Sequence, residues 1–312
     1  MQDNHLTSAA VFPGQGSQQP AMGIPWRDDP AWALVERAEA QLHRDLSGML
    51  LDPDRPPFGI RDAHLSVALC SMMAWHSLQP GFTPAVLSGH SLGLLPALYA
   101  AGVLSAADTI TAVAARAEVC ERACGQAAGG MTAVLGSARL AQAACAGVDC
   151  WVASDNAPAQ AVISGTRDGL RVAMARASLL GAADVIPLYA SGAFHCPLAQ
   201  DAAGEFARRL SGMTFRHART VVIHNAHPHQ PGDGTDWAAL VAADLATPVR
   251  WRETQLAFGG YGVNAVVSVG PGRTLTGLAA STLPDVLLHN VSSPRESIDA
   301  ILLAMSAELA PL

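Results

Sequence analysis

Short apolar runs alternate with longer stretches of helical period over the first part of the chain. Four apolar residues directly before Pro13-Gly14 are typical of a short buried strand that ends in a turn. In chain order, the pattern predicts a strand at 9–12, helices at 29–51 and 63–78, a strand at 84–87, and helices from about residue 92 and at 106–123. This alternation favours an α/β domain.

A different rhythm follows, with shorter elements in the order β-α-β-β-α-β, which is the order of a ferredoxin-like unit. The predicted elements are a strand at 131–135, a helix at 138–146, strands at 149–153 and 160–164, a helix at 167–180, and a strand at 184–188. Gly129-Gly130 and Ser191-Gly192 flank the unit as candidate hinges. Strands at 221–223 and 265–269 then resume the α/β pattern. We predict an α/β-hydrolase-like large subdomain, residues 1–126 and 194–312, with a small ferredoxin-like subdomain inserted at 127–193.

Composition supports a large core and argues against several classes of function. Half of the 312 residues are hydrophobic, the mean hydropathy is +0.23, and only 14% of residues are charged. Such a chain folds rather than stays disordered. A net charge of −7 and a pI near 5.8 argue against nucleic-acid binding, and 5% aromatic residues argue against a base-stacking surface.

The location follows from the cysteines and from the N-terminal sequence. The six cysteines form no regular framework, which is typical of free thiols in a reducing cytosol. The start MQDNHLTSAA lacks the basic region of a signal peptide. Residues 86–107 are nearly uncharged, but they contain Gly89, Ser91 and Pro96 and read better as a strand, turn and helix. We expect a cytoplasmic, monomeric protein that does not bind membranes.

The sharpest local motif is Gly89-His90-Ser91-Leu92-Gly93, a G-x-S-x-G sequence between a predicted strand and a predicted helix. In that context the glycines permit a sharp turn that exposes the serine hydroxyl. The following helix N-terminus would provide N–H groups for a developing oxyanion. The alternative is a simple tight turn without chemistry.

A nucleophilic serine needs a base, and His195 is the best candidate among eleven histidines. It lies in a turn that leaves the last strand of the small unit. His224, His227 and His229 could form a metal cluster, but no carboxylate or cysteine accompanies them in the sequence, which favours a solvated loop.

Motifs along the whole chain resemble those of the malonyl-CoA:acyl carrier protein transacylases and of related polyketide synthase acyltransferase domains. Those that carry the resemblance, in order, are FPGQGSQ at 12–18, GHSLG at 89–93, AGVLS at 101–105, Arg116, NAPAQAVISG at 156–165, GAFH at 192–195, PVRW at 248–251 and VGPGRTLTGL at 269–278. A match in this order over most of the chain excludes a chance similarity.

The resemblance implies a two-step transfer of a malonyl group from malonyl-CoA, through an ester on Ser91, to the phosphopantetheine thiol of an acyl carrier protein. His195 would be the base, and the backbone N–H groups of Gln15 and Leu92 would form the oxyanion hole. The main-chain carbonyl of Asp244, where the family usually has Gln, would orient His195. No cofactor is implied.

The resemblance also assigns the choice of acyl group to two residues. Arg116 would bind the free carboxylate of the acyl group, since a guanidinium forms two parallel hydrogen bonds with a carboxylate. Phe194 would crowd the α-carbon and favour malonyl over methylmalonyl.

Two departures leave the pathway open between fatty-acid and polyketide synthesis. The family usually has an acid where Leu94 stands and a Gln where His64 stands. The alternatives are the acyltransferase subunit of malonate decarboxylase, an editing hydrolase that uses water as acceptor, and a docking module that has lost activity. For the carrier protein, Arg208, Arg209, Arg216 and Arg219 form a candidate basic patch, with a solvated helix face as the alternative.

Overall fold

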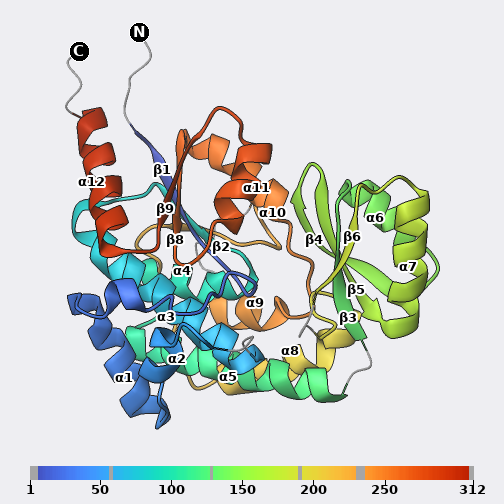
Figure 1. Cartoon of the computed structure of the whole chain (residues 1–312), viewed down its shortest axis with the longest axis horizontal. Coiled ribbons are helices and arrows are strands. Elements are labelled where there is room, and N and C mark those ends of the chain that lie inside the picture. The colour runs from blue at the N-terminus through green and yellow to red at the C-terminus, as the bar shows by residue number, and fades with distance from the viewer. Residues whose placement is uncertain (1–5, 56–58, 127–128, 189–191, 230–235, 309–312) are drawn as a thin grey trace.

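The computed structural model describes residues 6–55, 59–126, 129–188, 192–229 and 236–308, which form two sheets with helices around them (Figure 1). The larger sheet is parallel and has the strand order β7-β2-β1-β8-β9. Its strands are β1 (Ser8–Phe12), β2 (Val86–Gly89), β7 (Val221–Ile223), β8 (Ala265–Val269) and β9 (Leu287–Val291).

The central strand β1 is buried along its whole length because helices cover both faces of this sheet. Successive side chains of a strand point to opposite faces. Ala10 and Phe12 accordingly pack in the main core with α3 and α5, whereas Ala9 and Val11 pack in a second core with α10 and α11. This explains why the strand reads as a continuous apolar run rather than as an alternating one.

The helices of the large subdomain come from both ends of the chain. They are α1 (Ala33–Leu42), α2 (Ser47–Leu51), α3 (Ile60–Leu78), α4 (Leu94–Ala100), α5 (Ala106–Gln126), α8 (Gln200–Leu210), α9 (Trp237–Ala243), α10 (Trp251–Ala257), α11 (Thr274–Thr282) and α12 (Pro294–Glu308). None of the helices in the described part of the chain is long and apolar enough to cross a membrane.

The smaller sheet is antiparallel, with the order β4-β5-β3-β6. In chain order its elements are β3 (Gly129–Val134), α6 (Ala138–Cys145), β4 (Cys150–Ala157), β5 (Gln160–Thr166), α7 (Arg167–Leu179) and β6 (Val185–Leu188). Both helices contribute to a third core with this sheet. The predicted fold class, with its ferredoxin-like unit, is confirmed. The subdomain limits at 127 and 193 stay a prediction.

Three expectations about local structure need correction or qualification. Gly129-Gly130 is no hinge, because both residues pair with β5 as the first residues of β3. Ser191, in the second candidate hinge, lies outside the described residues. The helix predicted over 29–51 is broken at His43, whose φ of 51° is left-handed and ends α1.

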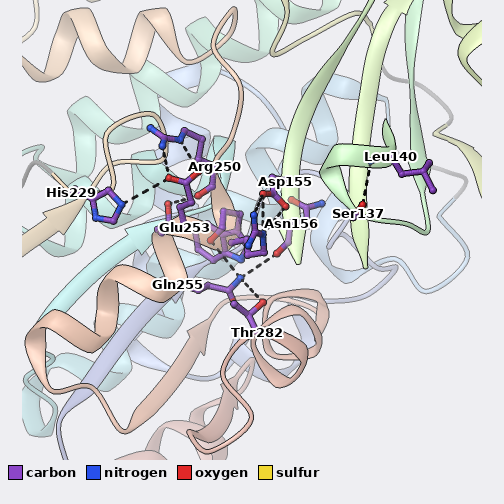
Figure 2. A network of polar contacts seen from close by, with 12 residues as sticks. Ser137, Leu140, Asp155, Asn156, His229, Arg250, Glu253, Gln255 and Thr282 are labelled. Atoms are coloured by element: carbon purple, nitrogen blue, oxygen red, sulfur yellow. Dashed lines mark hydrogen bonds and ion pairs between the residues drawn. The ribbon is translucent and has the colours of Figure 1, made fainter. Parts of the chain in front are cut away.

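The two subdomains meet along the end of β4, where a network of polar contacts holds them together (Figure 2). Arg252, on α10, donates three hydrogen bonds of 2.8–3.1 Å to the Asp155 carboxylate. Gln255, on the same helix, donates to the Asn156 carbonyl at 3.2 Å and to Thr282 Oγ1 at 3.4 Å. This junction fixes β4 beside the turn that carries Ser91, because the Asn156 side chain also lies 2.9 Å from His90 Nε2.

Candidate active site

Ser91 lies on a sharp turn between β2 and the short 3-10 helix Ser91–Gly93 that leads into α4. Its φ is 52°, in the left-handed region that non-glycine residues rarely adopt. Two glycines make the turn feasible: a Cβ on Gly93 would stand 2.0 Å from Phe12 O, and one on Gly89 would stand 2.0 Å from Gly93 O. Only glycine lets β1, β2 and the turn approach so closely.

The structure brings His195 to Ser91 from a segment 104 residues further along the chain. Ser91 Oγ lies 2.8 Å from His195 Nε2, and His195 Nδ1 lies 3.0 Å from the carbonyl oxygen of Thr247. A carbonyl only accepts hydrogen bonds, so Nδ1 carries the ring proton and Nε2 presents a lone pair to the Ser91 hydroxyl. The pair has the geometry of a nucleophile and its base.

The orienting carbonyl differs from the sequence prediction, which gave this role to Asp244 and is wrong. The chain leaves α9 at Ala243 and turns, and the Asp244 carbonyl accepts the backbone N–H of Thr247 at 3.4 Å inside that turn. The carbonyl that reaches the imidazole is therefore three residues later. Leu245, in the same turn, accepts the backbone N–H of His195 at 2.7 Å.

His195 is neutral in the free protein. Burial, reinforced by the nearby Arg116 charge, lowers its pKa to about 4, although Asp244 and the Thr247 carbonyl act in the opposite direction. The neutral form is the one that can accept a proton from Ser91.

Arg116, on α5, is the cation that lies beside Ser91. Its side chain is only 6% exposed, and Nη2 donates a hydrogen bond of 2.9 Å to Ser91 Oγ. Among the described residues, no carboxylate pairs with this guanidinium. A buried cation without a counter-ion is costly, which indicates that an anion is bound there during function.

His64, on α3, links Arg116 to the loop that follows β1. Its Nε2 lies 3.4 Å from Arg116 Nη1 and 3.1 Å from Gln15 Oε1. Burial and the Arg116 charge hold the pKa of His64 well below its usual value, so the ring is neutral. Sequence reasoning noted His64 only as a departure in the pocket and missed its contact with Arg116.

A cavity of about 410 Å³ opens above these residues, between the two subdomains. The large subdomain contributes Ser91, Arg116, His64 and the loop 14–18, and the small subdomain contributes side chains of β3 to β6. A volume of this size is typical of a pocket that binds a small organic ligand.

The comparisons with known proteins agree with this geometry. The family model for the acyl transferase domain matches residues 10–295. The malonyl CoA-acyl carrier protein transacylase of Synechocystis sp. is 33% identical over 92% of this chain and 97% of its own length, and that of Bacillus subtilis is 30% identical over 96% and 98%. The chain belongs to the acyl transferase family. Its resemblance to the malonyl-CoA:acyl carrier protein transacylases is thereby confirmed.

Solved structures of acyl transferases have the same fold. An acyl-carrier-protein S-malonyltransferase from Burkholderia pseudomallei superposes with a TM-score of 0.90 at 28% identity, covering 95% of this chain and 100% of that one. A malonyl-transacylase solved in complex with a type II polyketide synthase acyl-carrier protein gives 0.89 at 27% identity, covering 95% and 99%.

The remaining predicted residues of this acyl transferase lie at or near the cavity. Phe194 is 7% exposed and, like Gln15, lines the cavity. Leu92 is the second residue of the short helix that begins at Ser91. A Cβ on Gly14 would stand 2.5 Å from the His90 carbonyl oxygen, so the loop with Gln15 lies against the turn that carries the serine. The roles given to these residues stay predictions.

Two candidate sites lie outside the cavity, and some of their side chains are engaged in ion pairs. Arg209 of the candidate basic patch pairs with Glu118 at 3.0 Å and lies 3.7 Å from Glu205, so its charge is partly neutralised. His224 pairs with Asp244, and the exposed His229 lies 3.9 Å from Glu253. No group of three or more metal-ligating side chains occurs in the described ranges.

Proposed function

We propose that this protein transfers a malonyl group from malonyl-CoA to the phosphopantetheine thiol of an acyl carrier protein, through an ester on Ser91. The observation that carries the proposal is the buried Arg116 guanidinium, 2.9 Å from Ser91 Oγ and without a carboxylate partner among the described residues. An acyl group that ends in a carboxylate supplies the missing counter-ion and is held with its thioester beside the nucleophile.

In the first step, Nε2 of His195 takes the hydroxyl proton of Ser91 while Oγ attacks the thioester carbonyl carbon. The C–S bond then breaks, the CoA sulfur takes the proton from His195, and free CoA leaves a malonyl ester behind. We assign the oxyanion hole to the backbone N–H groups of Gln15 and Leu92. A single donor of this kind is worth about 3 kcal/mol in the transition state.

In the second step, the carrier thiol gives its proton to His195 and attacks the ester carbonyl. The C–O bond to Ser91 breaks, and Oγ recovers the proton from His195, which restores the enzyme. Phe194 beside the base limits the space at the α-carbon and favours malonyl over methylmalonyl. The side chains and the thioester supply all of this chemistry without a cofactor.

The similar proteins support the assignment of an acyl carrier protein as acceptor and the assignment of the pathway. Relatives named malonyl CoA-acyl carrier protein transacylase share 30–33% of their residues with this chain, and a structural neighbour was solved with a polyketide synthase carrier protein. We assign the enzyme to fatty-acid or polyketide synthesis. A cytoplasmic location stays a prediction, consistent with the six free thiols, and so does a monomeric state.

The alternatives share parts of this mechanism. The acyltransferase subunit of a malonate decarboxylase would load the same group onto a different carrier. An editing hydrolase would use water in the second step, but it has no need of Arg116, because it need not hold a carboxylate.

The direct test is acylation by malonyl-CoA alone, followed by intact-protein and peptide mass spectrometry. We expect one added malonyl group on the peptide that contains Ser91, and its transfer to a holo carrier protein added afterwards. Ser91→Ala should abolish labelling, whereas the control Ser281→Ala, on the exposed side of α11, should label normally. A wild-type enzyme that stays unlabelled while hydrolysing simple acyl thioesters would refute the transferase function.

A further inference from the structure

A histidine and a carboxylate lie together next to the turn that orients His195. The proposed mechanism uses the segment of the carboxylate only for its backbone. His224 Nε2 is 3.0 Å from Asp244 Oδ1, and both side chains are more than nine-tenths buried. We propose that His224 and Asp244 are positioning residues: their contact fixes the turn that holds His195 and keeps a carboxylate near this base, where it opposes the effect of the Arg116 charge. The inference rests on the proposed Ser91–His195 chemistry.

A second contact of His224 decides which ring nitrogen faces Asp244. Nδ1 of His224 lies 3.1 Å from the backbone N of Ala226, which donates to it. A ring nitrogen that accepts a hydrogen bond carries no proton, so the ring proton is on Nε2, the atom that faces Asp244. The imidazole of His224 therefore contacts the backbone of its own turn on one side and the Asp244 carboxylate on the other.

Asp244 begins the turn that orients His195. The two carbonyls that bind His195, from Leu245 and Thr247, lie one and three residues after Asp244. His195 itself has a left-handed φ of 58°, an uncommon conformation that its surroundings must hold in place. Anchoring Asp244 to His224 therefore limits the movement of the turn that holds the base.

His224, the other partner of Asp244, belongs to a segment that is joined to the strand before Ser91. His224 directly follows β7, which pairs with β2, the strand that leads to Ser91. Its neighbour Asn225 donates a hydrogen bond of 2.6 Å to the carbonyl of Gly89, at the end of β2. His224 is thus linked through Asp244 to the turn that holds His195, and Asn225 is linked through Gly89 to the strand that leads to Ser91.

The charge of Asp244 acts in the direction that a base needs. The charged or titratable groups that act on His195 are Arg116 from α5, His90 before the short helix, and Asp244 after α9. Next to this pair, His227 stacks on His224, with ring centroids 5.8 Å apart. Arg116 lowers the pKa of His195 and Asp244 raises it. When His195 takes the Ser91 proton, the negative charge of Asp244 therefore favours the imidazolium that forms.

The test measures Ser91 reactivity without any acyl donor, so that it is independent of the substrate. A fluorophosphonate forms an O–P bond with Ser91 as fluoride leaves, and the serine proton passes through His195 to solvent. We expect Asp244→Asn and Asp244→Gln to lower the maximal labelling rate roughly tenfold or more, because the base loses its carboxylate while the shape is kept. The probe concentration at half-maximal rate should stay unchanged.

The pH profile separates charge from anchoring. The wild-type labelling rate should be flat near neutrality and fall near pH 4 in brief pH-jump experiments, since the pKa of His195 is about 4. Asp244→Asn lowers that pKa further and moves the fall to lower pH. His224→Asn, which removes the anchor and keeps the carboxylate, should reduce the rate without moving the fall in that direction.

Glu296→Gln is the control, because Glu296 accepts hydrogen bonds from Ser292 and Ser293 at the start of α12, far along the chain from the dyad. It should label at the wild-type rate. The inference would be overturned if both Asp244 variants were labelled at the wild-type rate and their rates fell at the same low pH as that of the wild type. If Asp244→Asn does not fold, Asp244→Gln decides. Normal fluorophosphonate labelling without malonyl labelling would instead count against the proposed function alone.

Discussion

The chemistry around Ser91 depends on a balance between one cation and several neutral groups. Arg116 donates to the nucleophile, His64 and His195 are held neutral by burial and by the same cation, and the base is oriented by a carbonyl rather than by an acid. An acyl group without a carboxylate leaves Arg116 without its counter-ion. We therefore expect Arg116 to distinguish acyl groups that end in a carboxylate from those that do not.

Replacing Arg116 should change substrate preference rather than simply inactivate the enzyme. For Arg116→Ala we expect malonyl transfer to fall on the order of a hundredfold or more, since removing one partner of a buried charge pair costs about 2–5 kcal/mol. Acetyl transfer should fall by about tenfold at most, from the lost hydrogen bond to Ser91. The measurement is kcat/KM for both acyl-CoA substrates.

Arg122→Ala is the matched control, because Arg122 lies on the same helix but is exposed and pairs with Glu205. It should leave both substrates within about twofold, as surface ion pairs contribute little. Equal losses for malonyl and acetyl in Arg116→Ala would show that Arg116 only supports the structure.

At the scale of elements, the site depends on how closely three backbone segments approach one another. The end of β1, the end of β2 and the short helix at Ser91 meet where the His90 N–H donates to Phe12 O at 2.9 Å. Gly93 lies against the Phe12 carbonyl at a distance that no side chain allows. The strained φ of Ser91 is thus held by packing that requires glycine.

Gly93→Ala should destabilise the fold and inactivate the enzyme together. We expect a loss of about 2–4 kcal/mol in the free energy of unfolding, since a Cβ would stand 2.0 Å from Phe12 O and rigid backbone must shift. Urea denaturation measures the loss, and fluorophosphonate labelling of Ser91 measures the displacement of the serine.

The matched glycine is Gly277, on the exposed side of α11 with no atom near its missing Cβ. Gly277→Ala should be neutral or stabilise by up to about 1 kcal/mol, since alanine favours helix. If Gly93→Ala were as stable and active as Gly277→Ala, the close approach would have no part in forming the site.

At the scale of the whole molecule, the cavity exists only where the two subdomains meet. Asp155 and Asn156 at the end of β4 are tied to α10, and backbone hydrogen bonds join Ala153 and Asp155 to Val249 at 2.9 and 3.0 Å. The small subdomain supplies a wall of the cavity without supplying the dyad's serine or base-orienting carbonyl. Its position should therefore affect binding more than chemistry.

Asp155→Asn tests this division by weakening the contact with Arg252. We expect KM for malonyl-CoA to rise about threefold to tenfold, in line with the loss of roughly 1 kcal/mol from a partly buried bidentate pair. The maximal rate of acylation should stay within about twofold. Relative to the wild type, amide hydrogen exchange should become faster in β4 and stay unchanged in β8.

Glu205→Gln is its control, because it removes ion pairs with Arg122 and Arg209 away from the cavity and should not change KM. A lower maximal rate with unchanged KM in Asp155→Asn would show that the junction acts on the dyad rather than on the substrate.

Features that depend on local sequence were predicted well. β7 and β8 were expected at their observed limits, and β1 and five elements of the small subdomain lie within two residues of the prediction, whereas β4 ends four residues later than predicted. Strand β9 and helices α8 to α12 were not predicted individually. The predicted helix over 29–51 failed because the left-handed turn at His43 interrupts a pattern that continues on both sides.

The sequence by itself determined the fold class, since apolar periodicity is a property of neighbours along the chain. It also gave Ser91 and His195 as candidates, from a short motif and from the resemblance to the family, and Arg116 from that resemblance alone. Only the tertiary structure decided which groups surround them. The carbonyl on His195 belongs to Thr247 and not to Asp244, His64 contacts Arg116, and Asp244 meets His224. Such contacts join segments 20 to more than 50 residues apart, and the path of each turn, which no local pattern encodes, decides which atom arrives.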